Sequence, residues 1–172
     1  VYPGSSVIRY WTKYENQGLQ PVPMMDPSML SLAIQAGDAA DAIDFHWMVG
    51  AHCEPGCWTL RTEKLTAGKT RQFDSYDPFP PRGKPSPNDQ KMGSESYAPW
   101  YAVFDRQSRD GVIFGWDYMG HWKSSFLVDT NGRLATDIRV AGHKQQIPPG
   151  GSFITPMTLT APSPPKALAP AP

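Results

Sequence analysis

Aromatic residues recur at every second position in one short stretch of the sequence. Within residues 111–118, Phe114, Trp116 and Tyr118 follow this spacing. On a strand they would share one face, in a row of about 13 Å at a rise of about 3.3 Å per residue. Flat rings in such a row can stack on the apolar faces of sugars. A row of this length could cover about two or three sugar rings.

Groups that bind hydroxyls lie close to this row. Asp117 and His121 can accept and donate hydrogen bonds, and Trp100 falls on the strand that we expect to pair with 111–118. Binding sites for small molecules combine apolar surface with a few such polar groups. An oligo- or polysaccharide is therefore the predicted ligand. The candidate glycan-binding residues are Trp100, Trp116, Asp117, Tyr118, His121 and Trp122.

The same aromatic row also has a purely structural interpretation. A stripe of rings with a period of two more often fills the core between two sheets than it forms a ligand platform. Trp47 and Trp58, on either side of the Cys-Glu-Pro-Gly-Cys stretch at 53–57, raise the same question. The pattern leaves both interpretations open, but glycan binding requires at least one tryptophan to be exposed.

The two cysteines have three interpretations. With His46 and His52, Cys53 and Cys57 offer zinc ligands, but the spacing of three residues and the lack of a second pair disfavour zinc. The Pro-Gly turn between the cysteines would bring them within disulfide range, and two free thiols are the remaining alternative. We predict no metal and no cofactor.

Signatures of catalysis are missing from the sequence. It contains no G-x-S-x-G elbow, glycine-rich phosphate loop or H-E-x-x-H helix. Carboxylate pairs such as Asp44 and Asp117 exist, but acidic residues on strands are usually solvated, and only their separation would identify an acid and base pair. We therefore expect this chain not to be an enzyme by itself.

Composition narrows the class of protein. Lys and Arg number 16, as do Asp and Glu, so no net charge attracts nucleic acid or an anionic membrane. No apolar run approaches the roughly 18 residues that span a bilayer. The 19 Pro, 15 Gly and six Trp suit short strands and sharp turns better than long helices. The composition predicts an all-β fold.

Strand and turn patterns predict an antiparallel β-sandwich of about nine strands, supersandwich-like or jelly-roll-like, with little helix beyond a turn at 37–42. We expect one long strand at 7–16 and a Pro-rich connection at 21–27. Asn131-Gly132 favours a two-residue turn. Three hairpins are predicted, pairing 58–65 with 70–75, 97–105 with 111–118, and 122–128 with 134–140.

The chain divides into a domain and a linker. We expect a β-sandwich at 1–160, with a long Pro-rich surface loop at 77–96, and a Pro/Ala-rich linker at 161–172. A linker at that end implies a further domain beyond it. Because the sequence begins at Val1 without Met, we expect a processed or excised piece of a longer protein.

Several blocks resemble the N-terminal domain of family 36 glycoside hydrolases, the α-galactosidase group. They are Tyr2-Pro3 with Val7-Ile-Arg-Tyr-Trp11, Glu15-Asn-Gln-Gly18, Trp58 with Glu63, Gly111-Val-Ile-Phe-Gly-Trp116, and Ile147-Pro-Pro-Gly-Gly-Ser-Phe-Ile-Thr-Pro156. The last is similar to that family's L-x-P-G-E-x-F-x-T-P signature, with Gly151 in place of the acid. Tyr2 matches a point well inside the family's domain.

The resemblance implies a β-supersandwich of the galactose-mutarotase-like kind, packed on a catalytic (β/α)8 barrel. The family's catalytic aspartates lie in the barrel, so no catalytic residue of this chain is implied. Our first hypothesis is a non-catalytic domain of a secreted or periplasmic protein that binds glycan through exposed rings, with a cytoplasmic location as the alternative. The second is a structural domain that docks on a barrel or forms a homo-oligomer. The third is an autonomous glycoside hydrolase.

Overall fold

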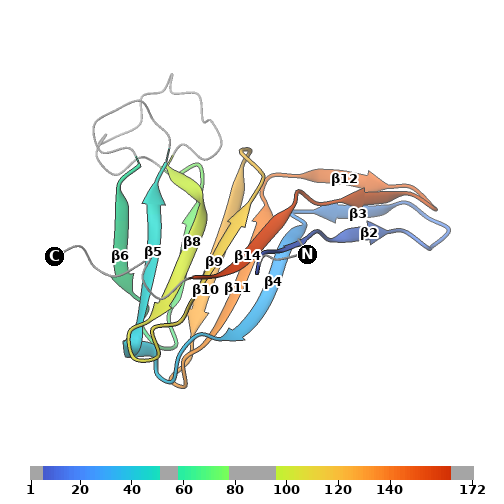
Figure 1. Cartoon of the computed structure of the whole chain (residues 1–172). Helices are drawn as coiled ribbons and strands as arrows, with labels where there is room; N and C mark the ends of the chain where they lie inside the picture. The colour runs from blue at the N-terminus through green and yellow to red at the C-terminus, as the bar shows by residue number, and fades with distance from the viewer. Residues whose placement is uncertain (1–5, 51–57, 78–95, 164–172) are drawn as a thin grey trace.

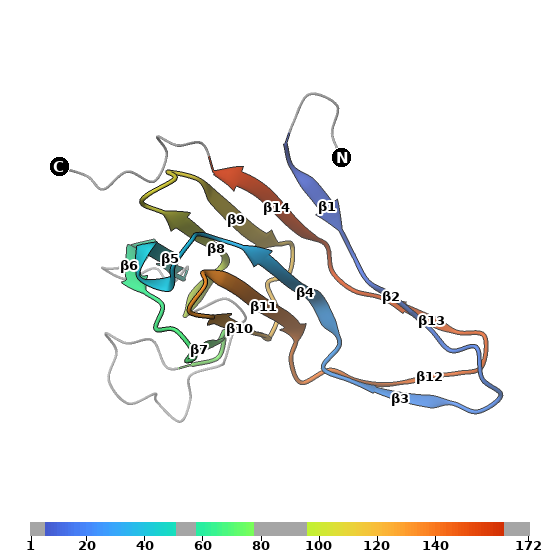
Figure 2. The ribbon, with the colours of Figure 1, turned by 90° about the horizontal axis from the view of Figure 1, so that it is seen from below.

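Two antiparallel sheets face each other across a core, and an arm projects from one side of them. The computed structural model describes residues 6–50, 58–77 and 96–163. Figure 1 shows one sheet in front of the other with the arm to the right, and Figure 2 shows the two layers from below. The all-β sandwich expected from the sequence is confirmed. Within the described ranges, no helix is long and apolar enough to cross a membrane.

The larger sheet has six strands, and the smaller has four. In order across the larger sheet they are β1 (Ile8–Tyr10), β14 (Thr158–Ser163), β9 (Gly111–Trp116), β8 (Tyr97–Asp105), β5 (Ile43–Val49) and β6 (Leu60–Lys64). In the smaller sheet they are β4 (Ser28–Gln35), β11 (Arg133–Val140), β10 (Trp122–Val128) and β7 (Thr70–Asp74). A short 3₁₀ turn, η1 (Ala40–Ala42), leads into β5 and matches the helical turn expected at 37–42.

The arm consists of two ribbons of two strands each. One ribbon pairs β2 (Lys13–Glu15) with β13 (Ser152–Ile154), and the other pairs β3 (Val22–Met25) with β12 (Lys144–Ile147). Figure 2 shows both ribbons leaving the sandwich side by side. The arm thus joins segments from opposite ends of the chain.

Alternation along the strands builds the core. On β10, Trp122, Ser124, Phe126 and Val128 are buried, while the residues between them face outward. The ring centroids of Phe126 lie 4.8 Å from Phe45 and 4.7 Å from Tyr101, both of which come from the other sheet. Such ring pairs contribute about 0.5–1.5 kcal/mol beyond the burial of area. Interlocked aromatic rings therefore hold the two layers together.

Two of the three predicted hairpins are present, and the third is wrong. β8 pairs with β9, and β10 with β11. β6 and β7 follow each other in sequence but belong to different sheets, because β6 pairs with β5 and β7 with β10. The turn signal at 66–69 therefore marks a crossing between layers. An ion pair between Arg71 and Glu63, 2.6 Å long, bridges the two strands.

The predicted long strand at 7–16 is divided. Its first part, β1, pairs with β14 in the sandwich, and its second part, β2, pairs with β13 in the arm. Thr12 and Thr155 exchange hydrogen bonds of 2.9 Å at this division. The Pro-rich connection expected at 21–27 contains β3. The described residues thus form fourteen strands, more than the nine expected, because several long runs are cut where they enter the arm.

Two further boundaries differ from the sequence expectations. The loop between β10 and β11 has four residues, Asp129 to Gly132, instead of two, because Asp129 Oδ1 accepts the N–H groups of Asn131 and Arg133 at 2.9 Å. Gly132 has a φ of 74°, and a Cβ there would lie 2.2 Å from the Gly37 carbonyl oxygen, so only glycine fits. β14 extends to Ser163, past the start of the expected linker.

Candidate functional site

Two of the predicted platform residues lie in the core. Trp116, at the end of β9, is 4% exposed, and Trp122, at the start of β10, is fully buried. Their ring centroids are 4.8 Å apart at an interplanar angle of 82°, an edge-to-face contact between the two sheets. Phe114, from the same stripe, is also fully buried. The alternation here faces the core, so these rings are not available to stack on a sugar.

Trp100 lies on the opposite face of the larger sheet. It precedes Tyr101, which points into the core, and it is partly exposed. Its partner on β9 is Gly115, where an added Cβ would meet the Leu159 side chain at 3.2 Å. The structure therefore separates Trp100 from Trp116 and Trp122 by the thickness of the sheet.

The other three predicted residues lie together in the loop between β9 and β10. Asp117 is exposed, and Tyr118 and His121 are partly exposed. The His121 ring stacks on Tyr76 at 3.9 Å with an interplanar angle of 5°. The Tyr118 ring folds so closely over Gly120 that a Cβ there would lie 2.4 Å from it. This arrangement forms a small surface cluster of aromatic rings.

Asp74 anchors this cluster. Its Oδ1 lies 2.7 Å from His121 Nε2 and 2.9 Å from the Tyr76 amide nitrogen, and its Oδ2 lies 3.2 Å from Lys123 Nζ. Partial burial opposes the charge on Asp74, but these hydrogen bonds outweigh it and hold its pKa below the ordinary value. Asp74 is therefore a fixed anion between a ring cluster and a lysine. We call Asp74, Tyr76, Tyr118, His121 and Lys123 the loop cluster.

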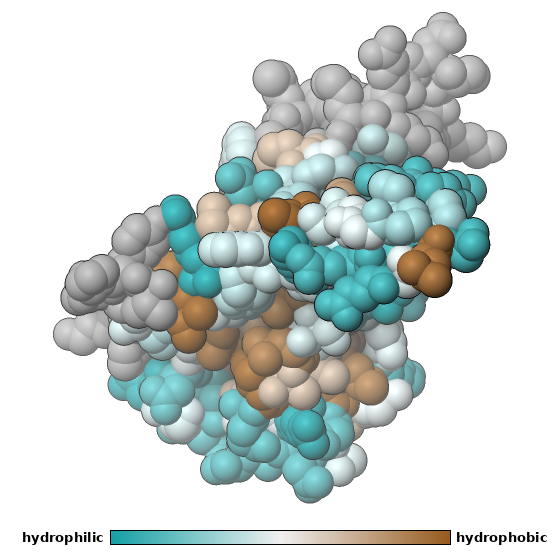
Figure 3. Space-filling model, turned by 90° about the vertical axis from the view of Figure 1, so that its right-hand side faces the viewer, coloured by the Kyte–Doolittle hydropathy of each residue, from teal (hydrophilic) through white to brown (hydrophobic). Residues whose placement is uncertain are grey.

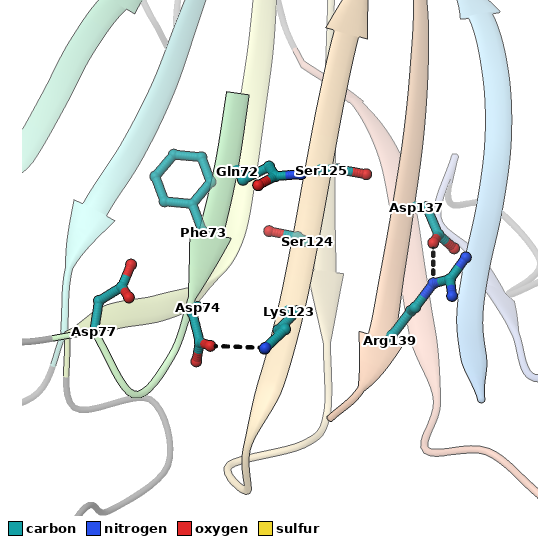
Figure 4. Close-up of a pocket in the computed structure, with 9 residues that line it drawn as sticks. All are labelled: Gln72, Phe73, Asp74, Asp77, Lys123, Ser124, Ser125, Asp137 and Arg139. Carbon is teal, nitrogen blue, oxygen red and sulfur yellow. Dashed lines mark hydrogen bonds and ion pairs between the residues drawn. The ribbon is translucent and has the colours of Figure 1, made fainter. Parts of the chain in front are cut away.

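A shallow hollow begins beside the loop cluster and extends across the outer face of the smaller sheet. It has a volume of about 530 Å³, and Figure 4 shows the residues that line it. A second hollow of about 370 Å³ shares Ser125 and Asp137 with the first and continues over β4. We call the two hollows together the polar trough. Phe73, Ser124, Leu32 and Thr136 also line the hollows, and the remaining lining residues are Gln72, Asp74, Asp77, Lys123, Ser125, Asp137, Arg139, Ser31, Ala33, Thr70, Leu127 and Ala135.

Apolar surface gathers on a different side, around the arm. A groove of about 590 Å³ opens between β1 and β14 of one sheet and β4 of the other. Figure 3 faces this side of the molecule and shows apolar surface in a hollow. The apolar side chains that line the groove include Ile8, Tyr10, Leu30, Leu32, Ile34 and Val112.

Exposed apolar side chains continue from the groove along the arm. Trp11 is 59% exposed, Met25 64% and Leu19 91%. Six of the ten large hydrophobic side chains that are exposed among the described residues belong to β1 or the arm, so one side of the molecule carries most of them. We call this set the arm surface. Its members are Ile8, Trp11, Leu19, Val22, Met25 and Ile154.

A buried asparagine holds the outer end of the arm together. Asn16 Nδ2 donates to the carbonyl oxygens of Gln20 and Ile147, both at 2.8 Å, and its Oδ1 accepts the Gly18 amide at 2.9 Å. The Asn16 backbone exchanges hydrogen bonds with residues 150–151. Two blocks that carry the family resemblance, at 15–18 and 147–156, therefore meet here and have a structural role.

The remaining candidates are the carboxylate pair, Asp44 and Asp117, and the possible zinc ligands. Asp44 on β5 is the partner of Phe104 on β8. Asp117 lies beyond Gly115 on β9, which is the partner of Trp100 at the other end of β8. About 13 Å or more along the strands therefore separates the two carboxylates. Cys53, Cys57 and His52 lie outside the described residues. Among the residues that are described, no three His, Cys, Asp or Glu side chains come together in a metal-binding group.

Comparisons with known proteins point to one enzyme group. No family model matches the sequence, and no curated protein does. The α-galactosidase of Lactobacillus brevis matches 95% of this chain with a TM-score of 0.71 at 14% identity. The family 36 α-galactosidase AgaA of Geobacillus stearothermophilus matches 92% with a TM-score of 0.68 at 20% identity. The galactosidase domain of AgaSK, an α-galactosidase–sucrose kinase, matches 92% with a TM-score of 0.70 at 16% identity.

This chain has the fold of one part of these α-galactosidases. The match covers only about a fifth of each of those chains, at 20%. The resemblance inferred from the short sequence blocks is thus confirmed for the fold. Sequence reasoning missed the arm surface and the polar trough, because neither is a motif. For the arm surface, the sequence offered one signal, which was the hydrophobic residues around positions 11–12 and 19–25, where the strand pattern is interrupted.

Proposed function

We propose that this chain is a non-catalytic ancillary domain of a glycoside hydrolase of the α-galactosidase kind. In this proposal a catalytic domain belongs to the same polypeptide, and the arm surface and its groove dock on that domain. Two facts support the catalytic domain as occupant: the shared fold, and the fact that the chain spans a fifth of the length of its structural neighbours. The catalytic machinery would then lie outside this chain.

The arm surface is the observation that carries the proposal. Large apolar side chains exposed together on one side of a domain mark contact with another protein surface. The arm cannot bury them itself, because each ribbon has only two strands. A docked catalytic domain would cover Trp11, Met25 and the groove between β1 and β4, and so provide the missing layer.

The test uses the full-length polypeptide that contains this chain. Trp11→Ser and Met25→Ser together should uncouple the two domains, because both side chains lose their apolar contacts. Scanning calorimetry should show one unfolding transition for the wild type and two for this variant, with hydrolysis of raffinose reduced. Leu60→Ser is the matched control, since Leu60 is 47% exposed on β6, away from the arm. A single unchanged transition in the double variant would contradict docking through the arm.

Glycan binding through exposed rings is the second candidate function. It is favoured by the loop cluster, in which the partly exposed Tyr118 and His121 lie beside Asp117. Trp11 and Trp58, 59% and 60% exposed, satisfy the requirement for an exposed tryptophan. Variants of AgaA have been described in complex with raffinose and with stachyose, and these sugars are the first probes to use.

Calorimetry of the 172-residue chain with stachyose tests this second function. If the loop cluster binds sugar, Tyr118→Ala should weaken binding at least tenfold, because a stacking ring and a hydroxyl are lost together. Tyr14→Ala, on β2 of the arm, is the control and should leave binding unchanged. If the chain binds neither stachyose nor raffinose, and no glucan or mannan, the glycan hypothesis fails and the docking proposal is unaffected.

A further inference from the structure

Strand register places three rows of side chains on the outer face of the smaller sheet. The middle row crosses all four strands, since Ser125 is the partner of Gln72 on one side and Asp137 on the other, and Asp137 is the partner of Ser31. Adjacent strands are about 4.8 Å apart, so this row is about 14 Å long. It presents an amide, two hydroxyls and a carboxylate in a line.

The two flanking rows differ in character. One row contains the charged residues Asp74, Lys123 and Arg139. The other contains Thr70, Leu127, Ala135 and Ala33, which are small or apolar. The trough therefore has a charged edge, a hydroxyl-rich floor and an apolar edge. This pattern matches a sugar chain, whose rings have polar rims and apolar faces.

Side chains on the floor have unused hydrogen-bonding groups. Within the described part of the chain, the side chains of Gln72, Ser125 and Ser31 have no hydrogen-bond partner, although all three lie on the same row. Asp137 is held in place, because Ser28 Oγ donates to its Oδ1 at 2.6 Å and Arg139 Nε donates to its Oδ2. The floor thus combines a fixed acceptor with groups that are free to bind a ligand.

The charges in the trough argue for a neutral ligand. Lys123 is paired with Asp74 at 3.2 Å, and Arg139 is paired with Asp137, as the dashed lines in Figure 4 show. Asp77 adds a further carboxylate to the lining. With both cations already paired, the trough has no spare positive charge to hold a phosphate, a sulfate or an acidic sugar.

We propose that the polar trough binds a neutral oligosaccharide of about two or three sugar rings, oriented along the row from Gln72 to Ser31. The class of ligand rests on the proposed attachment to a glycoside hydrolase, whereas the site rests on the register and the unpaired groups. The trough contains none of the residues of the arm surface, and it adjoins the apolar groove at Ser31, which lines both. Through Asp74 it adjoins the loop cluster, which would bind the next sugar unit.

The test uses the 172-residue chain, ¹⁵N-labelled, with three neutral probes: an α-galactosyl tetrasaccharide, mannotetraose and cellotetraose. At least one probe should shift the amide signals of residues 31, 72, 125 and 137. Ser125→Phe should weaken binding of that probe at least tenfold, because the ring fills the floor. Gln72→Ala, which removes a single hydrogen-bonding group without adding bulk, should weaken it about threefold to tenfold. Ser152→Phe, on the exposed strand β13, is the matched control and should bind as the wild type does.

Three outcomes would overturn the proposal. One is unchanged binding in both Ser125→Phe and Gln72→Ala with loss in Tyr118→Ala, which would place the sugar in the loop cluster alone. Another is no binding of any probe, which would also remove the second candidate function while the docking test stays valid. The third is that the trough signals change only when the catalytic domain is attached, which would make this face a contact between domains.

Discussion

The sandwich and the arm differ in where they place their large apolar side chains. In the sandwich, Phe45, Tyr101 and Phe126 meet across two layers and are fully buried. Trp11, where the chain enters the arm, and Met25, on β3, remain more than half exposed, and the ribbons of the arm have no second layer. The middle of the sandwich therefore buries its large rings, whereas the arm leaves Trp11 and Met25 exposed. Under the docking proposal, the second layer that the arm lacks comes from another protein surface.

The largest expected effect is in the core. Phe126→Ala removes a ring that contacts both Phe45 and Tyr101, and should lower the free energy of unfolding by about 3–5 kcal/mol. Urea unfolding followed by tryptophan fluorescence measures this change. Leu127→Ala is the matched control on the next residue, which faces outward, and should change it by about 0.5 kcal/mol or less. Equal effects of the two substitutions would show that β10 has no inner and outer face.

A smaller effect is expected at the end of the arm. Asn16→Ala leaves two carbonyl groups and the Gly18 amide without their partners, which costs about 1–3 kcal/mol for a buried group. The loss should be local, so hydrogen exchange should accelerate in residues 13–25 and 144–154 more than in β10. Gln17→Ala, on the exposed neighbour, should leave exchange unchanged. Uniform acceleration throughout the sandwich would contradict a separate arm.

Acid should remove a modest contribution from Asp74. Because hydrogen bonds lower its pKa in the folded chain, this carboxylate stabilises the fold above its unfolded pKa of about 3.9. The contribution is lost as the pH falls through the lowered folded value. Asp74→Asn should therefore reduce stability by about 1 kcal/mol or less at pH 6, and its effect should shrink as the pH falls below about 3.9. An effect that grows on acidification would have the wrong sign.

The smallest effect on stability is expected at the arm surface. Trp11→Ser in the 172-residue chain alone should change the free energy of unfolding by about 0.5 kcal/mol or less, because the ring is mostly exposed. The same substitution is expected to matter in the full polypeptide. Urea unfolding of both forms measures the contrast. A large loss in the chain alone would mean that the arm buries Trp11 itself.

Local patterns predicted the class of fold but not the partners of each strand. Alternation along β10 and β11 identified a sandwich, and the hairpins of β8 with β9 and β10 with β11 were correct. β6 was misplaced because none of its five residues is fully buried, so its alternation carried little information about which sheet it joins. The break at Trp11 depends on β13 and β14, which lie about 140 residues further along the chain.

The candidate site was predicted only in part, because the two faces of a strand look alike in the sequence. A period of two assigns Phe114, Trp116 and Tyr118 to one face of a strand, but does not say whether that face meets a second sheet or solvent. The structure buries the first two, and the strand ends before the third. The polar trough depends on register across four strands, which no local pattern contains.

Docking through the arm is tested most directly by hydrogen exchange. The 172-residue chain alone should be compared with the full-length polypeptide. If the arm docks, the amides of residues 8–25 and 144–154 should become protected in the full-length protein, while the amides of β10 and β11 should exchange as before. Unchanged exchange in the arm, with new protection only in the smaller sheet, would contradict it.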